Sequence, residues 1–381
     1  MAYFDNAATT YPKPAAVYNF MDKFYRNFGA NVGRGDYNIA KTANEVVEET
    51  RNLLKELLQC PTKETVFTPS ATIALNIIIQ GLIQDGARNI YISPFEHNAV
   101  TRILYHYESL KVINVYQLTV TAELEYDLER IKYQFDNVRP DLVIVSHASN
   151  VIGLVAPIEK IFKTAKKYNA YTLADMSQTA GLVECNVGLS TFDFAVFAGH
   201  KTLYAPTGIA GFVMNPDINF SNILFGGTGI SSAEQTMPSI LPNRYEMGTL
   251  NISGIGGLNA ALKWNKSIGI HQIYDKEIEN RKRLLEIFNQ YSWIKIIGNN
   301  ERQKYVGIVS ILIDGISSDS MGLVFNEHGI AVRSGLQCAP SAHKFLGTFP
   351  SGTIRFSVGY FTSDIAYNEL QDALDAIEGE M

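Results

Sequence analysis

Cysteine is scarce in this chain of 381 residues, which contains only Cys60, Cys185 and Cys338. Three cysteines are too few for a disulfide framework, and their spacing matches no zinc-binding motif. We therefore expect a protein of a reducing compartment, most simply the cytoplasm, and we expect no metal site.

Long apolar runs are also missing. The longest apolar stretch, residues 73–83, is interrupted by Asn76 and Gln80 and is too short to span a bilayer. The opening residues, MAYFDNAATTYPKP, lack a charged region followed by an apolar run, so we expect no signal peptide.

Positive charge does not predominate, because 32 Lys and Arg residues stand against 38 Asp and Glu residues, a net charge of −6. Nucleic acids and anionic membranes attract proteins with a basic excess, so we expect neither as a partner. Apolar residues make up 46% of the chain, enough for a sizeable core. The length predicts two or three structural units.

Short β-rich runs alternate with helical patterns through the first part of the chain. Some runs are apolar throughout, such as LVIV at 142–145, as is typical of strands with both faces covered. The alternation predicts an α/β fold with helices on both faces of the sheet. The predicted strands cover 65–68, 89–93, 112–118, 142–146, 171–174, 193–198 and 208–214.

The pattern changes after Ser253, where a long helical stretch begins. It is followed by strand-like runs at 306–313 and 352–359 and by helical patterns near 318–328 and 365–377. This arrangement indicates a smaller α+β unit, with a boundary inside the long helical stretch. We predict a large domain over 12–263 and a small domain over 264–381, which also includes residues 1–11.

Polar residues gather directly after the predicted strands. Ligands of open α/β sheets bind at the carboxyl ends of the strands, so these residues are candidates for a site. Each of them alone is readily explained as a loop or capping residue, but their common position on one edge favours a function. They are His97, Asn150, Asp175, Gln178, His200 and Lys201.

Lys201 beside Asp175 is either a structural ion pair or a covalent catalyst. A Lys amine with a lowered pKa forms Schiff bases with carbonyl groups. Pyridoxal phosphate requires such a Lys, together with a carboxylate against its ring nitrogen. The turn at 68–72 ends a strand and opens an apolar helix, which suits a phosphate group, although an ordinary helix cap explains it equally well. Motifs of dinucleotide-binding, P-loop and metalloprotease sites are missing.

Ten sequence blocks spread over nearly the whole chain occur in the order of one known family. The blocks are YFDNAATT (3–10), NVGRGDY (31–37), TPSAT (68–72), PFEHNA (94–99), SHASNVIG (146–153), ADMSQTAG (174–181), FAGHKTLYAPTGIAG (197–211), RYEMGTLN (244–251), VRSGLQCAP (332–340) and GTIRFSVGYF (352–361). They resemble the class V, fold-type I pyridoxal-phosphate enzymes, and within them the cysteine desulfurases and selenocysteine lyases. The resemblance implies a large domain with a mostly parallel seven-stranded sheet that binds the cofactor, plus a smaller α+β domain.

The resemblance also assigns roles around the cofactor ring. It implies that Lys201 binds pyridoxal 5'-phosphate covalently and later moves protons. His97 would stack on the ring and take part in acid–base chemistry, and Asp175 would pair with the ring nitrogen. Gln178 would bond the ring oxygen, and Asn150 would contact both ring and substrate.

For the phosphate, the resemblance implies the backbone of Ala71 and Thr72, the Thr72 hydroxyl and a donor on His200. It also implies a Thr from a partner subunit, which matches Thr249 here. We therefore expect a homodimer with shared sites.

The resemblance makes Cys338 the nucleophile that takes sulfur from the substrate and becomes a persulfide, leaving alanine. The alternative is that Cys338 only packs in the core as a small hydrophobic residue. Arg355 matches the residue that holds the substrate carboxylate, a task that suits a guanidinium, and its alternative is an ordinary ion-pair Arg. The short segment around Cys338 resembles the group with a compact active-site loop, which implies a sulfur-acceptor protein as a further partner.

Three positions depart from the family pattern. Ala71 and Ala198 stand where the family often has Thr and Ser, so two possible phosphate donors are missing. Gln337 replaces the His that commonly precedes the reactive Cys, which removes one possible source of thiol activation.

The leading hypothesis is a cysteine desulfurase that converts L-cysteine to L-alanine. A selenocysteine lyase acting on L-selenocysteine, another C–S lyase and an aminotransferase are alternatives, because all of them would share the cofactor site. A non-catalytic scaffold on the same fold is a remote alternative, since Lys201, Asp175 and Arg355 are all present.

Overall fold

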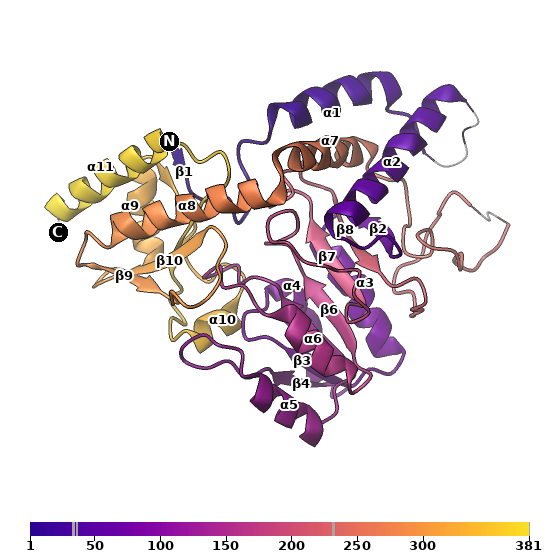
Figure 1. The fold of residues 1–381 in the computed structure, drawn as a ribbon, viewed down its shortest axis with the longest axis horizontal. Helices are drawn as coiled ribbons and strands as arrows, with labels where there is room; N and C mark the ends of the chain where they lie inside the picture. Colours follow the sequence, from indigo (N-terminus) through magenta and orange to yellow (C-terminus); the bar gives the residue numbers. More distant parts are fainter. Residues whose placement is uncertain (33–34, 36, 231–232, 381) are drawn as a thin grey trace.

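The computed structural model describes residues 1–32, 35, 37–230 and 233–380. Its centre is a seven-stranded sheet with the strand order β2-β8-β7-β6-β5-β3-β4 (Figure 1). All neighbouring strands are parallel except β8, which is antiparallel to both β2 and β7. The strands are β2 (Glu64–Thr68), β3 (Asn89–Ile92), β4 (Asn114–Gln117), β5 (Leu142–Ser146), β6 (Tyr171–Asp175), β7 (Phe194–Ala198) and β8 (Ala210–Met214). The prediction of a mostly parallel sheet of seven strands is confirmed, with β4 shorter than expected.

Helices cover both faces of this sheet. Successive side chains of a strand point to opposite faces, so in β5 Leu142 and Ile144 pack into one core and Val143 and Val145 into another. The first core includes α3 (Ala71–Gln84) and α4 (Asn98–Ser109). The second includes α2 (Asn38–Leu57), α5 (Leu128–Asn137), α6 (Ile158–Lys166) and α7 (Ile252–Ile268). This double coverage explains why the central strands are apolar throughout.

The helices α1 (Ala15–Phe28) and α2 were not predicted from the sequence, and both pack against α7. Two glycines of α7 allow the close approach of α1. A Cβ atom at Gly257 would lie 2.7 Å from the sulfur of Met21, and one at Gly256 would lie 2.8 Å from the ring of Phe24. Side chains at these positions would force α1 away from α7.

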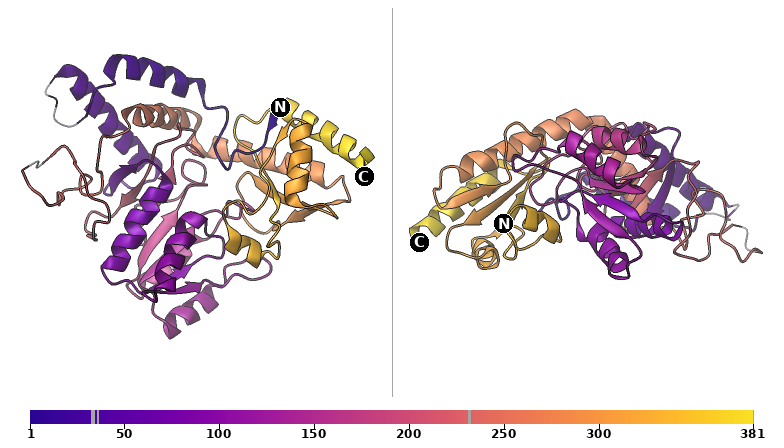
Figure 2. Two further views of the ribbon diagram at one scale, coloured as in Figure 1. Left: turned by 180° about the vertical axis from the view of Figure 1, so that it is seen from behind. Right: turned by 90° about the horizontal axis from the view of Figure 1, so that it is seen from below.

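A second group of elements forms a smaller α+β unit. Its sheet has the antiparallel order β12-β10-β9, and a separate parallel pair joins β1 to β11. Figures 1 and 2 show the amino terminus beside α11 in this unit. The elements are β1 (Ala2–Tyr3), α8 (Ile270–Phe288), β9 (Ile294–Ile297), β10 (Ile308–Ile313), α9 (Ser318–Glu327), β11 (Ile330–Ala331), α10 (Pro340–Phe345), β12 (Ile354–Ser357) and α11 (Asp364–Glu380).

The long helical stretch predicted after Ser253 is wrong as a single helix. It consists of α7 and α8, which are separated at Gly269, where φ is 92°. Because that backbone conformation suits glycine and ends a helix, Gly269 is a natural break between units. We propose the predicted division into a large domain, 12–263, and a small one, 264–381 with 1–11, although the break at Gly269 lies shortly after the predicted boundary, which falls within α7.

Two further observations concern the chain as a whole. Within the described ranges, no helix combines the length and the apolar character needed to cross a membrane. The block at 31–37 falls partly on residues 33, 34 and 36, which lie outside the described residues.

Candidate active site

One cavity lies at the carboxyl ends of the parallel strands. It is lined from β5, β6 and β7 and from the loops that follow β3 and precede α3. The topology therefore gathers residues that are more than a hundred positions apart in the sequence. Eight of the predicted site residues line it: Ala71, Thr72, His97, Asn150, Asp175, Gln178, His200 and Lys201.

His97 is the N-cap of α4. Its Nδ1 accepts a hydrogen bond from the backbone N–H of Ala99 at 3.0 Å, so the ring proton lies on Nε2. Burial, together with the nearby charge of Lys201, lowers the pKa of His97 to about 4. The imidazole is therefore a neutral, flat group at neutral pH, available to lie against an aromatic ring.

Asp175 ends β6 and points into the same cavity, where its Oδ1 accepts from the backbone N–H of Ser177 at 2.9 Å. Lys201 follows β7. Burial lowers the pKa of Lys201, and the carboxylate of Asp175 opposes that shift in part. A Lys amine of lowered pKa is the nucleophilic form that carbonyl chemistry requires.

Lys13 holds the turn that carries Lys201 in place. The Nζ of Lys13 donates to the backbone oxygen of His200 and to Oγ1 of Thr10, each at 2.7 Å. Burial lowers the pKa of Lys13 to about 8. Lys13 had no role in the sequence prediction, although it lies just after the block at 3–10.

The amides of Gln178 and Asn150 are held by the backbone. Nε2 of Gln178 donates to the oxygen of Ala7 at 2.9 Å, and Nδ2 of Asn150 donates to the oxygen of Gln337 at 2.7 Å. Both side chains thus tie the cavity wall to segments of the small unit.

One end of the cavity has the character of an anion site. Ser70 caps α3 through a hydrogen bond from the N–H of Ile73, and Ala71 and Thr72 form the first turn with its free N–H groups. Nδ1 of His200, which lines the same cavity, is buried without a hydrogen-bond partner among the described residues. A buried nitrogen of this kind, in one cavity with a helix N-terminus, suits a phosphate oxygen.

Cys338 borders a second cavity that adjoins the first and shares Thr72, His97 and Ala99 with it. Its side chain is exposed, whereas Cys60 and Cys185 are buried. Burial raises the pKa of Cys60 to about 11 and that of Cys185 to about 12, so neither forms a thiolate at neutral pH.

A backbone hydrogen bond holds the Cys338 segment in place. The backbone N–H of Asn98 donates to the oxygen of Cys338 at 2.7 Å, directly after His97. The thiol-bearing residue is therefore attached to the residue that follows the cavity imidazole.

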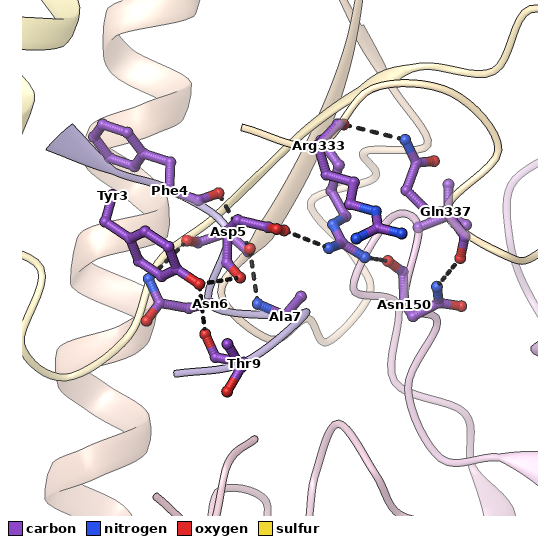
Figure 3. A network of polar contacts seen from close by, with 12 residues as sticks. Tyr3, Phe4, Asp5, Asn6, Ala7, Thr9, Asn150, Arg333 and Gln337 are labelled. Carbon is purple, nitrogen blue, oxygen red and sulfur yellow. Dashed lines mark hydrogen bonds and ion pairs between the residues drawn. The ribbon is translucent and has the colours of Figure 1, made fainter. Parts of the chain in front are cut away.

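Arg355 is buried beneath the cavity wall. Its Nη1 donates to the backbone oxygen of Asn150 at 2.9 Å, and its Nη2 pairs with Oδ1 of Asp5 at 2.7 Å. Within the part of the chain that the structure describes, its Nε has no hydrogen-bond partner. Burial lowers the pKa of Arg355, and Asp5 opposes this shift. Figure 3 shows Asp5 with its neighbour Tyr3 on one side of this network and Asn150 with Gln337 on the other.

Two predicted site residues, Arg355 and Thr249, line neither of these two cavities. Arg355 is linked to the wall of the first cavity by a hydrogen bond to the backbone oxygen of Asn150. Thr249 is exposed and lines a different cavity, together with Arg51 and Glu246. Asp5 belongs to the block at 3–10, yet no local sequence pattern indicates that it pairs with Arg355.

The comparisons with known proteins agree with this architecture. The family model described as aminotransferase class-V matches residues 2–366. A probable cysteine desulfurase of Pyrococcus abyssi is 31% identical over 368 residues, which cover 95% of this chain and 90% of the relative. An apo cysteine desulfurase of Thermococcus onnurineus superposes with a TM-score of 0.90 at 28% identity, covering 100% of this chain and 95% of the other.

A cysteine desulfurase of Escherichia coli, solved in an S-sulfonic acid form, has a TM-score of 0.87 at 25% identity, over 100% of this chain and 95% of that one. The family model, the sequence relative and both structures span both units, including the segments that carry Lys201 and Cys338. The chain belongs to the class V aminotransferase family.

Proposed function

We propose that this protein is a pyridoxal-phosphate-dependent cysteine desulfurase that converts L-cysteine to L-alanine and leaves a persulfide on Cys338. One observation carries the proposal. Lys201, from the large unit, and Cys338, from the small unit, line two adjoining cavities that share His97. The relatives named cysteine desulfurase support the same activity.

The cavity residues fit pyridoxal phosphate. His97 supplies a neutral ring surface, Asp175 a carboxylate for the ring nitrogen, and Gln178 and Asn150 polar groups at the rim. The first turn of α3 and the unpartnered Nδ1 of His200 supply donors for the phosphate. When bound, this cofactor acts as an electron sink that stabilises negative charge on the substrate α-carbon.

Lys201 is the residue that attaches the cofactor and moves the α-proton in this proposal. Burial lowers the pKa of its Nζ, which favours the neutral amine that accepts a proton from the substrate. Lys13 keeps the turn under Lys201 in place through the backbone oxygen of His200. Asp175 supplies the negative charge that a protonated Lys201 needs.

Cys338 receives the sulfur. Its thiolate attacks the sulfur of the bound cysteine, the carbon–sulfur bond breaks, and the electron pair remains with the alanine portion, which is then protonated. Arg355 draws the substrate carboxylate toward Asn150, because its Nε has no hydrogen-bond partner among the residues that the structure describes. The exposed position of Cys338 leaves the persulfide accessible to a sulfur-acceptor protein.

We further propose that the active form is a homodimer in which Thr249 completes the phosphate site of the partner subunit. Thr249 is exposed and lies outside the cavity of its own chain, as a residue that serves a neighbouring site must. Its segment is anchored by the buried pair of Arg51 and Glu246, so a defined position can be presented to a second chain.

The decisive experiment compares wild type with Cys338→Ala after purification with pyridoxal phosphate. We expect both proteins to be yellow, and only wild type to form alanine from L-cysteine in the presence of a thiol reductant. A yellow wild type that forms no alanine would overturn the desulfurase proposal. A Cys338→Ala variant that still releases alanine from L-selenocysteine would redirect it toward a selenocysteine lyase.

A further inference from the structure

The segment that carries Cys338 has an unusual backbone conformation. Gln337 has φ 40° and Cys338 has φ 56°, so two successive residues with side chains occupy the left-handed region. This region is sterically unfavourable for such residues and persists only where surrounding contacts impose it. Those contacts therefore identify what positions the thiol.

The side-chain amide of Gln337 is buried and fully hydrogen-bonded. Its Nε2 donates to the backbone oxygens of Thr353 at 2.8 Å and Arg333 at 3.2 Å. Its Oε1 accepts from the ring Nε2 of His343 at 2.8 Å and from Oγ1 of Thr353 at 3.3 Å. These four bonds use the whole donor and acceptor capacity of an amide, so the side chain has one stable orientation.

His343 fixes that orientation. Because Oε1 of Gln337 accepts, the Nε2 of His343 must carry the proton, and its Nδ1 then accepts from the hydroxyl of Thr348 at 2.7 Å. Burial lowers the pKa of His343 to about 4, so the ring stays neutral at neutral pH and keeps this tautomer. The Gln337 amide is therefore locked between a fixed imidazole and the backbone of Thr353.

The backbone on both sides of the thiol is hydrogen-bonded to the large unit, at the loop after β5 and at the start of α4. Asn150 donates to the oxygen of Gln337, as Figure 3 shows, and the N–H of Asn98 donates to the oxygen of Cys338, both at 2.7 Å. Asn98 directly follows His97. A displacement of Gln337 is thus passed to Cys338 and changes where the thiol lies relative to His97.

We propose that Gln337, oriented by His343, is the positioning residue of the nucleophile, because its amide holds Cys338 in the left-handed conformation beside His97. The inference rests on the proposed function, in which Cys338 accepts the substrate sulfur. Gln337 lines neither cavity, so its side chain does not contact the substrate directly.

The test uses Gln337→Leu and His343→Leu, which remove the amide or its donor. His343→Gln is the matched control, because a Gln side chain at 343 keeps an N–H donor for Gln337. We expect the two Leu variants to lower kcat for alanine formation about 10- to 100-fold, as a misplaced reacting group does. The KM for L-cysteine should change less than about twofold, because the Arg355 and cofactor contacts are intact.

A second measurement is independent of activity. Hydrogen–deuterium exchange of the segment 336–339 in the holoenzyme should be about tenfold faster in both Leu variants, because the contacts that close this segment are lost. His343→Gln should match wild type in kcat and in exchange. The visible spectrum should be the same in all four proteins.

Wild-type kcat and wild-type exchange in both Leu variants would overturn the positioning role. A wild type that forms no alanine would contradict the proposed function, whereas the exchange comparison would still decide whether Gln337 holds the segment. Should Gln337→Leu not fold, the pair of His343 variants gives the same decision.

Discussion

Arg355 and Asp5 form an ion pair of 2.7 Å between residues 350 positions apart, and the guanidinium is almost wholly buried. The pair joins the start of the chain to β12, beneath the wall of the active-site cavity. Because a buried charge without a partner is costly, Asp5 sets the electrostatic surroundings of Arg355, the residue that we propose to bind the substrate carboxylate.

Asp5→Asn should therefore destabilise the holoenzyme by about 2 kcal/mol, because Arg355 loses its compensating charge. L-alanine brings its own carboxylate, so it should raise the Tm of this variant more than that of wild type. Differential scanning calorimetry with and without L-alanine measures both effects. Asp22→Asn is the control, since Asp22 belongs to an exposed pair with Arg26 and its loss should be nearly neutral. An equal response of variant and wild type to L-alanine would contradict the predicted role of Asp5.

Ala198→Ser restores a hydroxyl at a position that lines the cofactor cavity. A hydroxyl that donates to a phosphate oxygen should tighten the binding of pyridoxal phosphate about three- to tenfold. Titration of apoenzyme with the cofactor, followed by absorbance, gives the Kd. Ala74→Ser, which lies in the apolar core away from the cavity, should not tighten binding. Unchanged affinity in Ala198→Ser would mean that the phosphate lies elsewhere.

Glu246 holds the segment that carries Thr249. It pairs with Arg51 at 2.8 Å through each of its oxygens, and one oxygen also accepts from the N–H of Phe67 at 2.6 Å. Glu246→Gln should lower the free energy of unfolding by about 3 kcal/mol, because Arg51 becomes a buried charge without a full partner.

The matched control for that experiment is Glu48→Gln. Glu48 is the second partner of Arg51, but its side chain is 68% exposed, so the loss should be below about 0.5 kcal/mol. Urea unfolding of both variants measures the difference. Comparable losses of unfolding free energy in the two variants would contradict the prediction that the buried Glu246 pair is the more stabilising one.

His343 should make the protein sensitive to acid. Its pKa is about 4 in the folded state, against about 6.5 in an unfolded chain, so the unfolded state binds more protons between these values. The stability linked to this group is thus complete above pH 6.5 or so and is lost as the pH falls toward 4. In His343→Gln, the decrease in unfolding free energy on acidification should therefore be about 1–2 kcal/mol smaller than in wild type.

The quantity to compare is the change in unfolding free energy between neutral and mildly acidic buffer, obtained from urea titrations. His271→Gln is the control, because the His271 side chain is 77% exposed. The unfolding free energy of the His271 variant should fall with decreasing pH as steeply as that of wild type. In the His343 variant it should fall less steeply. Parallel slopes in all three proteins would contradict the prediction.

The strands of the large sheet could be predicted from the sequence because burial on both faces leaves a direct mark, as in LVIVS at Leu142–Ser146. The carboxyl-end rule then placed His97, Asp175 and Lys201 on one edge, where the structure brings them together. Fold and cavity were therefore accessible from local patterns.

The helix α2 could have been predicted as well. Its buried residues include Ala40, Ala43, Val47 and Leu54, which recur at helical spacing and mark one face. The break at Gly269 was missed for a different reason, because a glycine inside a helical pattern does not reveal its φ angle.

The contacts of Asp5 and Gln337 could not be predicted. The pairing of Asp5 with Arg355 spans almost the whole chain and leaves no local periodicity. Gln337 was interpreted as a missing activating residue, whereas its amide bonds depend on a left-handed turn and on a His six positions away. Such contacts are properties of the assembled tertiary structure.

The parallel pairing of β1 with β11 also orders events during synthesis. Residues 2–5 are synthesised long before their partners at 330–331 and 355. At ordinary translation rates of about 5–20 residues per second, Asp5 waits roughly 20–70 s for Arg355. A nascent chain can thus fold its large sheet, β2 to β8, before Arg355 is available to pair with Asp5 beneath the cavity wall.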